Sequence, residues 1–100
     1  MGLIMLKIIA SNHIRKESLN KFLDLAHELI VKSRAEEGNV SYTINVSLDD
    51  PCLFTFVEVW KDQAAFDTHS QSEHFTRIFP KVSELSDSAT PPTFYQELEA

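Results

Sequence analysis

Two stretches near the middle of the chain alternate between side chains of different kinds, and a short turn separates them. Residues 39–47 read NVSYTINVS and residues 52–60 read CLFTFVEVW. Alternation with a period of two is typical of β-strands, in which successive side chains point to opposite faces of a sheet. Asp49, Asp50 and Pro51 between the two stretches favour a turn. The pattern predicts an antiparallel hairpin, so the rest of the chain must extend and cover a sheet.

Helical spacing precedes the hairpin. Between residues 16 and 36 the apolar side chains fall at positions 19, 22, 23, 26, 29 and 30, which form one stripe along a helix. Gly38 and Asn39 are expected to end this helix through a left-handed cap. Before it, residues 3–10 form a β-branched apolar run that predicts a strand, and residues 11–16 form a polar connection.

Two short helices are predicted after the hairpin. Asp62 can cap the first and Ser72 the second, because their side-chain oxygens accept hydrogen bonds from the first amides of a helix. Pro80 is expected to kink or end the second helix, since it has no amide hydrogen. A loop over residues 86–92 then leads to a last strand over residues 93–98.

The predicted order, β-α-β-β-α-β, is that of the ferredoxin-like α+β fold, with the second helical stretch divided in two. One hundred residues suffice for one domain, which we expect to span residues 1–100. The four strands would form an antiparallel sheet with helices over one face. The side chains on the other face then decide what else the sheet contacts.

The two faces of the hairpin differ in composition. The mostly aliphatic face is expected beneath the helices, and it comprises Val40, Tyr42, Ile44, Val46, Leu53, Thr55, Val57 and Val59. The opposite face carries three aromatic rings and an acid, namely Phe54, Phe56, Glu58 and Trp60. Soluble monomers seldom expose such a patch. A second copy of the chain is therefore expected to cover it, giving a homodimer with the two sheets face to face.

Charge and composition exclude several classes of partner. Fifteen acidic against nine basic residues give a net charge of −6, which disfavours nucleic acid and anionic membranes. The apolar N-terminal run of residues 1–11 is too short for a membrane span, which takes roughly 20 residues. One cysteine, Cys52, permits no internal disulfide and suits a cytoplasmic protein. With two glycines, the chain contains no glycine-rich nucleotide-binding loop.

Three motifs together resemble the antibiotic biosynthesis monooxygenase family. They are the turn Glu37-Gly38-Asn39 before the second strand, Glu58-Val59-Trp60 at the end of the third, and the sequence from His69 to Phe75 leading into the last helix. With the order of elements, the resemblance covers roughly residues 3–98. It implies a dimeric α+β barrel. Some members oxidise phenols to quinones with molecular oxygen and neither metal nor flavin, close relatives degrade haem, and others isomerise a small phosphorylated signalling molecule.

Such oxygenation needs a base that deprotonates the substrate, in an apolar pocket. Glu58 is the candidate, because the rings of Phe54, Phe56 and Trp60 would keep it poorly hydrated and raise its pKa. The same rings would bind an aromatic substrate, with Trp60 stacking on it. A hydrogen bond from Glu58 across the dimer interface, and core packing by Trp60, are the structural alternatives.

His69 and His74 are further candidates for acid–base catalysis. His69 follows Ala65 at helical spacing and so lies on a buried face, where it could instead bind a backbone carbonyl. His74 falls in the first helical turn after Ser72, where the helix dipole disfavours a charged ring. Asn39 is a candidate oxyanion donor, although asparagine after a glycine is also an ordinary turn residue. The four histidines show no metal-binding spacing, so neither a metal nor another cofactor is expected.

The expected function is that of a cofactor-independent monooxygenase acting on a small aromatic or quinol-type compound with oxygen. Haem degradation is disfavoured, because Phe79 stands where those relatives carry a histidine and residues 3–10 lack their asparagine. A phosphate isomerase would need a cation in the pocket. Lys7 could supply it, since its face of the strand is not determined. A non-catalytic dimer that binds a small aromatic molecule is the third alternative.

Overall fold

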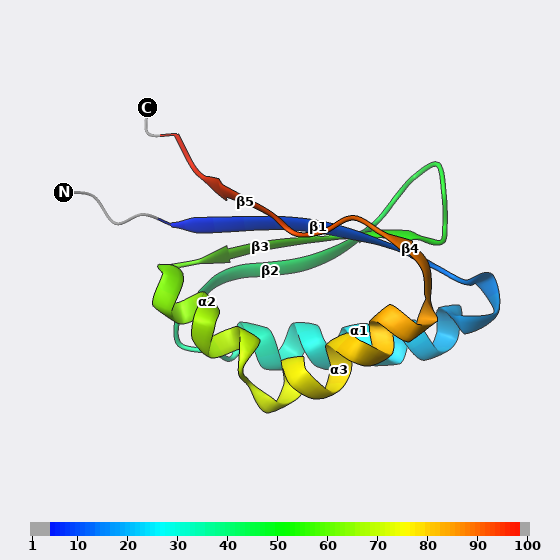
Figure 1. Ribbon diagram of the computed structural model, residues 1–100, viewed down its shortest axis with the longest axis horizontal. Helices are drawn as coiled ribbons and strands as arrows, with labels where there is room; N and C mark the ends of the chain where they lie inside the picture. The colour runs from blue at the N-terminus through cyan, green and yellow to red at the C-terminus, as the bar shows by residue number, and fades with distance from the viewer. Residues whose placement is uncertain (1–4, 99–100) are drawn as a thin grey trace.

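The computed structural model describes residues 5–98 and consists of an antiparallel sheet with all its helices on one face (Figure 1). The elements are β1 (Leu6–Ile14), a 3-10 turn (Lys16–Ser18), α1 (Leu19–Arg34), β2 (Asn39–Val46), β3 (Leu53–Trp60), α2 (Gln63–Ser70), α3 (Glu73–Leu85), β4 (Ser86–Ala89) and β5 (Thr93–Gln96). The strand order is β2-β3-β1-β4, and β5 also pairs with β1. The predicted ferredoxin-like α+β fold is confirmed, with a sheet that does not close on itself.

The first strand lies further along the chain than predicted. It runs over Leu6–Ile14, so residues 11–14 continue the strand instead of forming a connection. They pair with β3, as Ser11 does with Thr55, and the end of the strand also pairs with β4. Hydrogen bonds on both sides outweigh the polar composition of this segment. Residues 3 and 4 of the predicted strand lie outside the described part of the chain.

Gly38 does not adopt the predicted left-handed cap, because no residue among 5–98 has a positive φ. The helix α1 ends at Arg34, and a short turn leads to β2. Gly38 is required for another reason. A Cβ atom at this position would lie 2.3 Å from the Cβ of Ala65 in α2, far inside van der Waals contact. The glycine therefore lets the turn approach α2 closely.

Both predicted helix caps after the hairpin are confirmed. The Asp62 side chain accepts a hydrogen bond from the Ala65 amide at 2.8 Å, and the Ser72 hydroxyl accepts one from the Phe75 amide at 3.2 Å. The two caps start α2 and α3 as separate helices, so His69 and His74 are not held at one helical spacing.

Of the two outcomes expected at Pro80, a kink or an end of the helix, the end does not occur, because α3 continues to Leu85. The side chains of Ile78, Val82 and Leu85 are buried on either side of the proline. Burying three such side chains contributes roughly 1.5–3 kcal/mol each, which outweighs the roughly 3 kcal/mol that an internal proline costs. Residues 86–89, predicted as loop, form β4, and the last strand is limited to Thr93–Gln96.

The assignment of the two hairpin faces is also wrong for β3. Tyr42 pairs with Glu58 and Ile44 with Phe56, so these side chains share one face of the sheet. That face lies beneath the helices, since the ring of Phe54 packs against Phe22 of α1 with centroids 4.5 Å apart. The aromatic rings of β3 are thus core residues within one chain. The face without helices instead carries β-branched and polar side chains, including Ile9, Thr43, Thr55 and Val57.

The core between the sheet and the helices follows from this arrangement. Its largest fully buried side chains include two aromatic residues of the hairpin, one of α1 and a histidine: Trp60, Tyr42, Phe22 and His69. None of the helices in residues 5–98 is long and apolar enough to cross a membrane.

Candidate active site

A cavity of about 120 Å³ lies between the sheet and α3, closed at one end by the connection from β4 to β5. Its walls are mostly aromatic and aliphatic, with two polar strand residues and one acid. They include Ile8, Asn12, Tyr42, Phe56, Glu58, Phe75 and Phe79. An apolar cavity of about 150 Å³ holds a benzene ring, so this one is matched to a single aromatic ring.

Glu58 is the one acidic residue that the described part of the chain contributes to the cavity wall. It lies two residues before the end of β3 and is 8% exposed. Burial raises the pKa of its carboxyl group from 4.5 to about 7, while the hydrogen bond from Trp60 lowers the pKa and the nearby charge of Glu36 raises it. The carboxyl group therefore changes protonation near neutral pH, where a general base is most effective.

Trp60 supports Glu58 from behind the cavity wall. Its indole Nε1 donates a hydrogen bond to Glu58 Oε1 at 3.0 Å, and the side chain is fully buried. The indole also lies against the ring of His69, with centroids 4.4 Å apart. The cavity walls do not include Trp60, so this residue orients the carboxyl group of Glu58.

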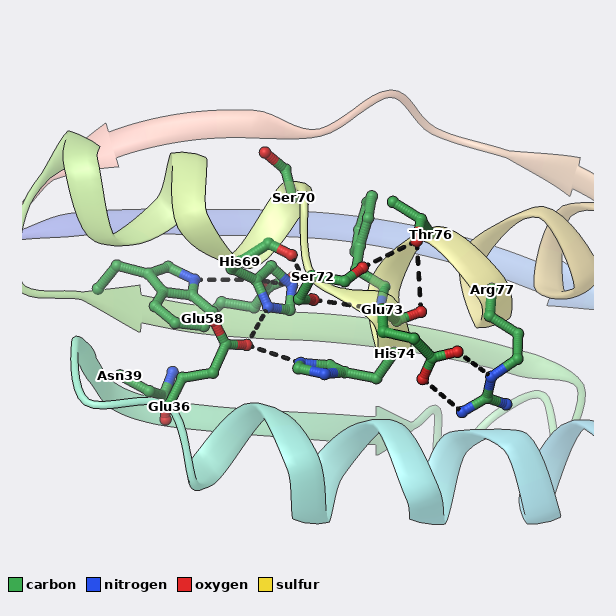
Figure 2. Close-up of polar contacts among 12 residues, drawn as sticks. Glu36, Asn39, Glu58, His69, Ser70, Ser72, Glu73, His74, Thr76 and Arg77 are labelled. Atoms are coloured by element: carbon green, nitrogen blue, oxygen red, sulfur yellow. Dashed lines mark hydrogen bonds and ion pairs between the residues drawn. The ribbon is translucent and has the colours of Figure 1, made fainter.

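Behind Trp60, one carboxylate holds two histidines (Figure 2). Oε2 of Glu36, in the turn after α1, lies 2.6 Å from His69 Nδ1 and 2.8 Å from His74 Nε2. Because a carboxylate only accepts hydrogen bonds, both nitrogens carry the hydrogen. The cluster joins the α1–β2 turn, α2 and the first turn of α3.

His69 is completely buried, and burial lowers the pKa of its imidazole below 6.5 despite the hydrogen bond to Glu36. The ring is therefore neutral at pH 7. With its hydrogen on Nδ1, the other nitrogen, Nε2, bears a lone pair and no hydrogen. Nε2 makes no hydrogen bond within the described residues and lies 3.8 Å from Glu58 Oε1.

Glu36, His69 and His74 also offer three potential metal-ligand atoms within 4.8 Å of one another. Ligands of a tetrahedral zinc ion, at about 2.0–2.1 Å from the metal, would lie roughly 3.3 Å apart. The oxygen–nitrogen separations of 2.6 and 2.8 Å are shorter and match hydrogen bonds. Shared hydrogens account for this cluster better than a zinc ion does.

Comparison with known proteins agrees with the motifs and the geometry. The family model described as antibiotic biosynthesis monooxygenase matches residues 5–81. The chain belongs to the antibiotic biosynthesis monooxygenase family. It is 36% identical over 72 residues to the Bacillus subtilis protein "Putative monooxygenase YcnE", covering 72% of this chain and 76% of that protein.

Two solved structures extend the likeness over nearly the whole chain. A conserved protein from Methanosarcina mazei Go1 is 32% identical with a TM-score of 0.90, covering 96% of this chain and 95% of its own. A crystal structure of an antibiotic biosynthesis monooxygenase is 35% identical with a TM-score of 0.83, and the match covers 95% of this chain and 98% of that chain. The predicted family is confirmed, and a monooxygenase-like function is supported.

The residues predicted as a site are divided among four places in this family member. Glu58 and Phe56 line the cavity, whereas Trp60, His69 and His74 lie in the hydrogen-bonded layer behind it. Phe54 packs against α1 and lines an open groove between α1 and the hairpin. Asn39 donates its amide hydrogens to backbone carbonyls of the hairpin and does not reach the cavity.

Three residues of the site were not singled out in the sequence. Tyr42 lies beneath the helices as predicted, and the cavity is on that side of the sheet. Asn12 shares the parity of Ile8 and Ile14, a signal that becomes visible only once the strand is extended to residue 14. No feature of the sequence distinguishes Glu36 from the exposed Glu37 beside it.

The haem comparison changes in one respect. Residues 3–10 contain no asparagine, but the first strand continues to Ile14, and Asn12 in it is buried in the cavity wall. Phe79 still stands in the place of the histidine of the haem-degrading relatives, and it lines the same cavity. Phe79 and the small cavity volume therefore disfavour haem degradation.

Proposed function

We propose that this protein is a cofactor-independent monooxygenase that oxidises a small phenol or quinol with molecular oxygen. The observation that carries the proposal is Glu58, a buried carboxyl group with a pKa of about 7 in the wall of an aromatic cavity. A base of this kind removes a phenolic proton at neutral pH. The resulting phenolate is the electron-rich species that reacts with oxygen.

The size and charge of the cavity support a substrate with one ring. Its volume of about 120 Å³ is close to that of cavities that hold benzene. No lysine or arginine is among its wall residues, and Lys7 pairs with Val59 on the face of the sheet away from the helices. A phosphorylated substrate would find no cation there, which counts against the isomerase alternative.

The proposed steps balance for a phenol oxidised to a quinone and water. The ionised carboxylate of Glu58 takes the phenolic proton, and a ring carbon of the phenolate forms a bond to oxygen. The peroxide formed takes the proton back from Glu58. Glu58 then removes the hydrogen on that carbon, the O–O bond breaks, and the released hydroxide takes this proton to become water. The substrate loses two electrons when the carbon–oxygen bond forms and two more when the O–O bond breaks, and molecular oxygen accepts all four.

Tyr42 and Asn12 are the donors that would stabilise the phenolate in this scheme. Burial raises the pKa of the Tyr42 hydroxyl far above its ordinary value, so it keeps its hydrogen at any relevant pH. Asn12 donates one amide hydrogen to Ser86 Oγ at 3.0 Å, which leaves a second for the cavity. Donors fixed in a dry site stabilise developing charge more strongly than water does.

We also propose that the protein acts as a homodimer in the cytoplasm. The sheet face without helices carries half-buried Ile9, Val57 and Thr55, and a second copy of this face would cover them. Sedimentation velocity tests the dimer. V57E should give monomers by placing a charge at the centre of the contact, and a wild-type monomer at micromolar concentration would reject it.

The experiment for the activity is oxygen uptake with a panel of single-ring hydroquinones and phenols in the presence of EDTA. E58Q should lose about 100-fold or more of the rate, the usual contribution of a general base. E37Q, which removes an exposed carboxylate nearby, should retain it. Binding of these compounds without oxygen uptake by the wild type would reject the oxygenase and favour the non-catalytic binding protein.

A further inference from the structure

Two hollows of the molecule lie on opposite sides of His69. Glu58 lines the aromatic cavity, and Glu36 lines a wide surface cleft of about 530 Å³ between the α1–β2 turn and α2. His69 faces one acid at each of its two ring nitrogens, Glu36 at Nδ1 and Glu58 at Nε2. A carboxyl group, an imidazole and a second carboxyl group therefore join the cavity to solvent.

The state of His69 suits the transfer of a proton. Nδ1–H donates to Glu36 Oε2 at 2.6 Å, and the bare Nε2 faces Glu58 Oε1 at 3.8 Å without a hydrogen-bond partner among residues 5–98. Buried polar atoms without a hydrogen bond are uncommon in folded proteins. This one is explained if the carboxyl group of Glu58 donates to it in part of the molecules.

The groups around this line do not compete for the proton. Tyr42 from β2 keeps its hydrogen, because burial raises its pKa far above neutral pH. Trp60 from β3 donates to Glu58, and an indole cannot accept. His74 from α3 donates to the same oxygen of Glu36 as His69 does, so it holds that carboxylate at the exit.

We propose that Glu58 exchanges its proton with solvent through His69 and Glu36. The O–H of Glu58 gives its proton to Nε2 while Nδ1–H gives its proton to Glu36 Oε2, which releases it into the cleft. One O–H bond and one N–H bond break, and one of each forms. The ring then carries its hydrogen on Nε2 and returns to its first state when a proton moves inward. No oxidant or other reactant is needed.

In the resting structure this path is interrupted between Glu58 and His69. The gap of 3.8 Å is about 1 Å longer than a hydrogen bond, so exchange requires rotation of the Glu58 carboxyl group. The bond from Trp60 Nε1 favours the resting orientation. A role of the path in turnover rests on the proposed function, because a substrate in the cavity would separate Glu58 from water. The exchange itself does not depend on any substrate.

Trp60 provides a readout without substrate, because it is the sole tryptophan and contacts both Glu58 and His69. After a small temperature jump near pH 7, its fluorescence should relax at the rate of proton exchange at Glu58. The phase should be absent in E58Q, which assigns it. It should be at least tenfold slower in E36Q and unchanged in E37Q. A wild-type rate in E36Q would overturn the proposal.

A second comparison separates proton transfer from packing. In H69A, added 4-methylimidazole should restore the fast phase, whereas 1-methylimidazole, of equal size, should not, because its alkylated nitrogen carries no hydrogen. Equal restoration by both would mean that the ring of His69 only fills space. If H69A does not fold, the pair E36Q and E37Q decides. Absence of oxygen uptake by the wild type would refute the proposed function and leave this result unaffected.

Discussion

Replacing Glu58 by glutamine should stabilise the protein at high pH and leave its stability nearly unchanged at low pH. The carboxyl group has a pKa of about 7 in the folded chain and 4.5 as its ordinary value. Between these values the unfolded chain loses the proton while the folded chain keeps it, so the free energy of unfolding falls as pH rises. Glutamine is neutral at every pH, and its amide oxygen still accepts from Trp60.

The size of the effect follows from the two pKa values. Each tenfold difference in proton affinity corresponds to about 1.4 kcal/mol, so the difference between 4.5 and about 7 amounts to about 3 kcal/mol. This full difference applies above pH 7, and little of it below pH 4.5. E58Q should therefore exceed the wild type by about 3 kcal/mol at pH 8.5 and by much less at pH 4.5.

Urea unfolding followed by Trp60 fluorescence measures both values. The chain concentration is held constant, because association would shift the apparent stability. E37Q is the matched control, because it removes an exposed carboxylate of the α1–β2 turn. Titrating groups that lie far from Glu58 contribute to wild type and variant alike and cancel in the difference. A difference between E58Q and wild type that does not change with pH would refute the reasoning.

Three further predictions concern other parts of the molecule. His13 bridges Asp87 and Asp50, and hydrogen bonds to these two acids raise its pKa. The stability that the charged ring contributes is therefore present below pH 6.5 and is lost as pH rises through the raised pKa. H13A should lower Tm more at pH 6 than at pH 9. G38A should destabilise the fold by about 1–3 kcal/mol through the clash with Ala65, and the double variant G38A/A65G should recover most of this in urea unfolding. Dialysis against EDTA should leave Tm and oxygen uptake unchanged, because hydrogen bonds hold the histidine–carboxylate cluster; a loss of either would show a bound metal.

The order of elements and both helix caps could be predicted from the sequence because each depends on local chemistry. The faces of β3 could not, because both of its faces carry apolar side chains and alternation alone does not say which is covered. Register decides the matter: Tyr42 lies opposite Glu58 and Val46 opposite Phe54, so residues of equal parity share a face. Matching the faces by aliphatic composition joined residues of opposite parity. The large area of three aromatic rings was the better guide, since such rings dominate protein cores.

The candidate site was predictable only in part for the same reason. Glu58 was identified, with a raised pKa, from its aromatic neighbours in the strand, and of these Trp60 donates a hydrogen bond to it and Phe56 lines the same cavity. The remaining contacts join distant segments. Glu36 meets His69 and His74 across 33 and 38 residues. Asn12 enters the cavity because β1 pairs with β3 over its whole length. Such contacts depend on tertiary packing, and neither composition nor residue spacing alone predicts them.

The protonation state of Glu58 affects both the stability of this fold and its proposed activity. Oxidation requires the ionised form of Glu58, so kcat/KM should rise with pH through about 7, the pKa that burial gives the free protein. The free energy of unfolding should fall over the interval from 4.5 to that same value, because ionisation is what the buried site disfavours. Activity and loss of stability should therefore approach their limits at one pH, and E58Q should abolish both changes. If the activity profile were to level off two pH units away from the stability profile, a group other than Glu58 would be the base.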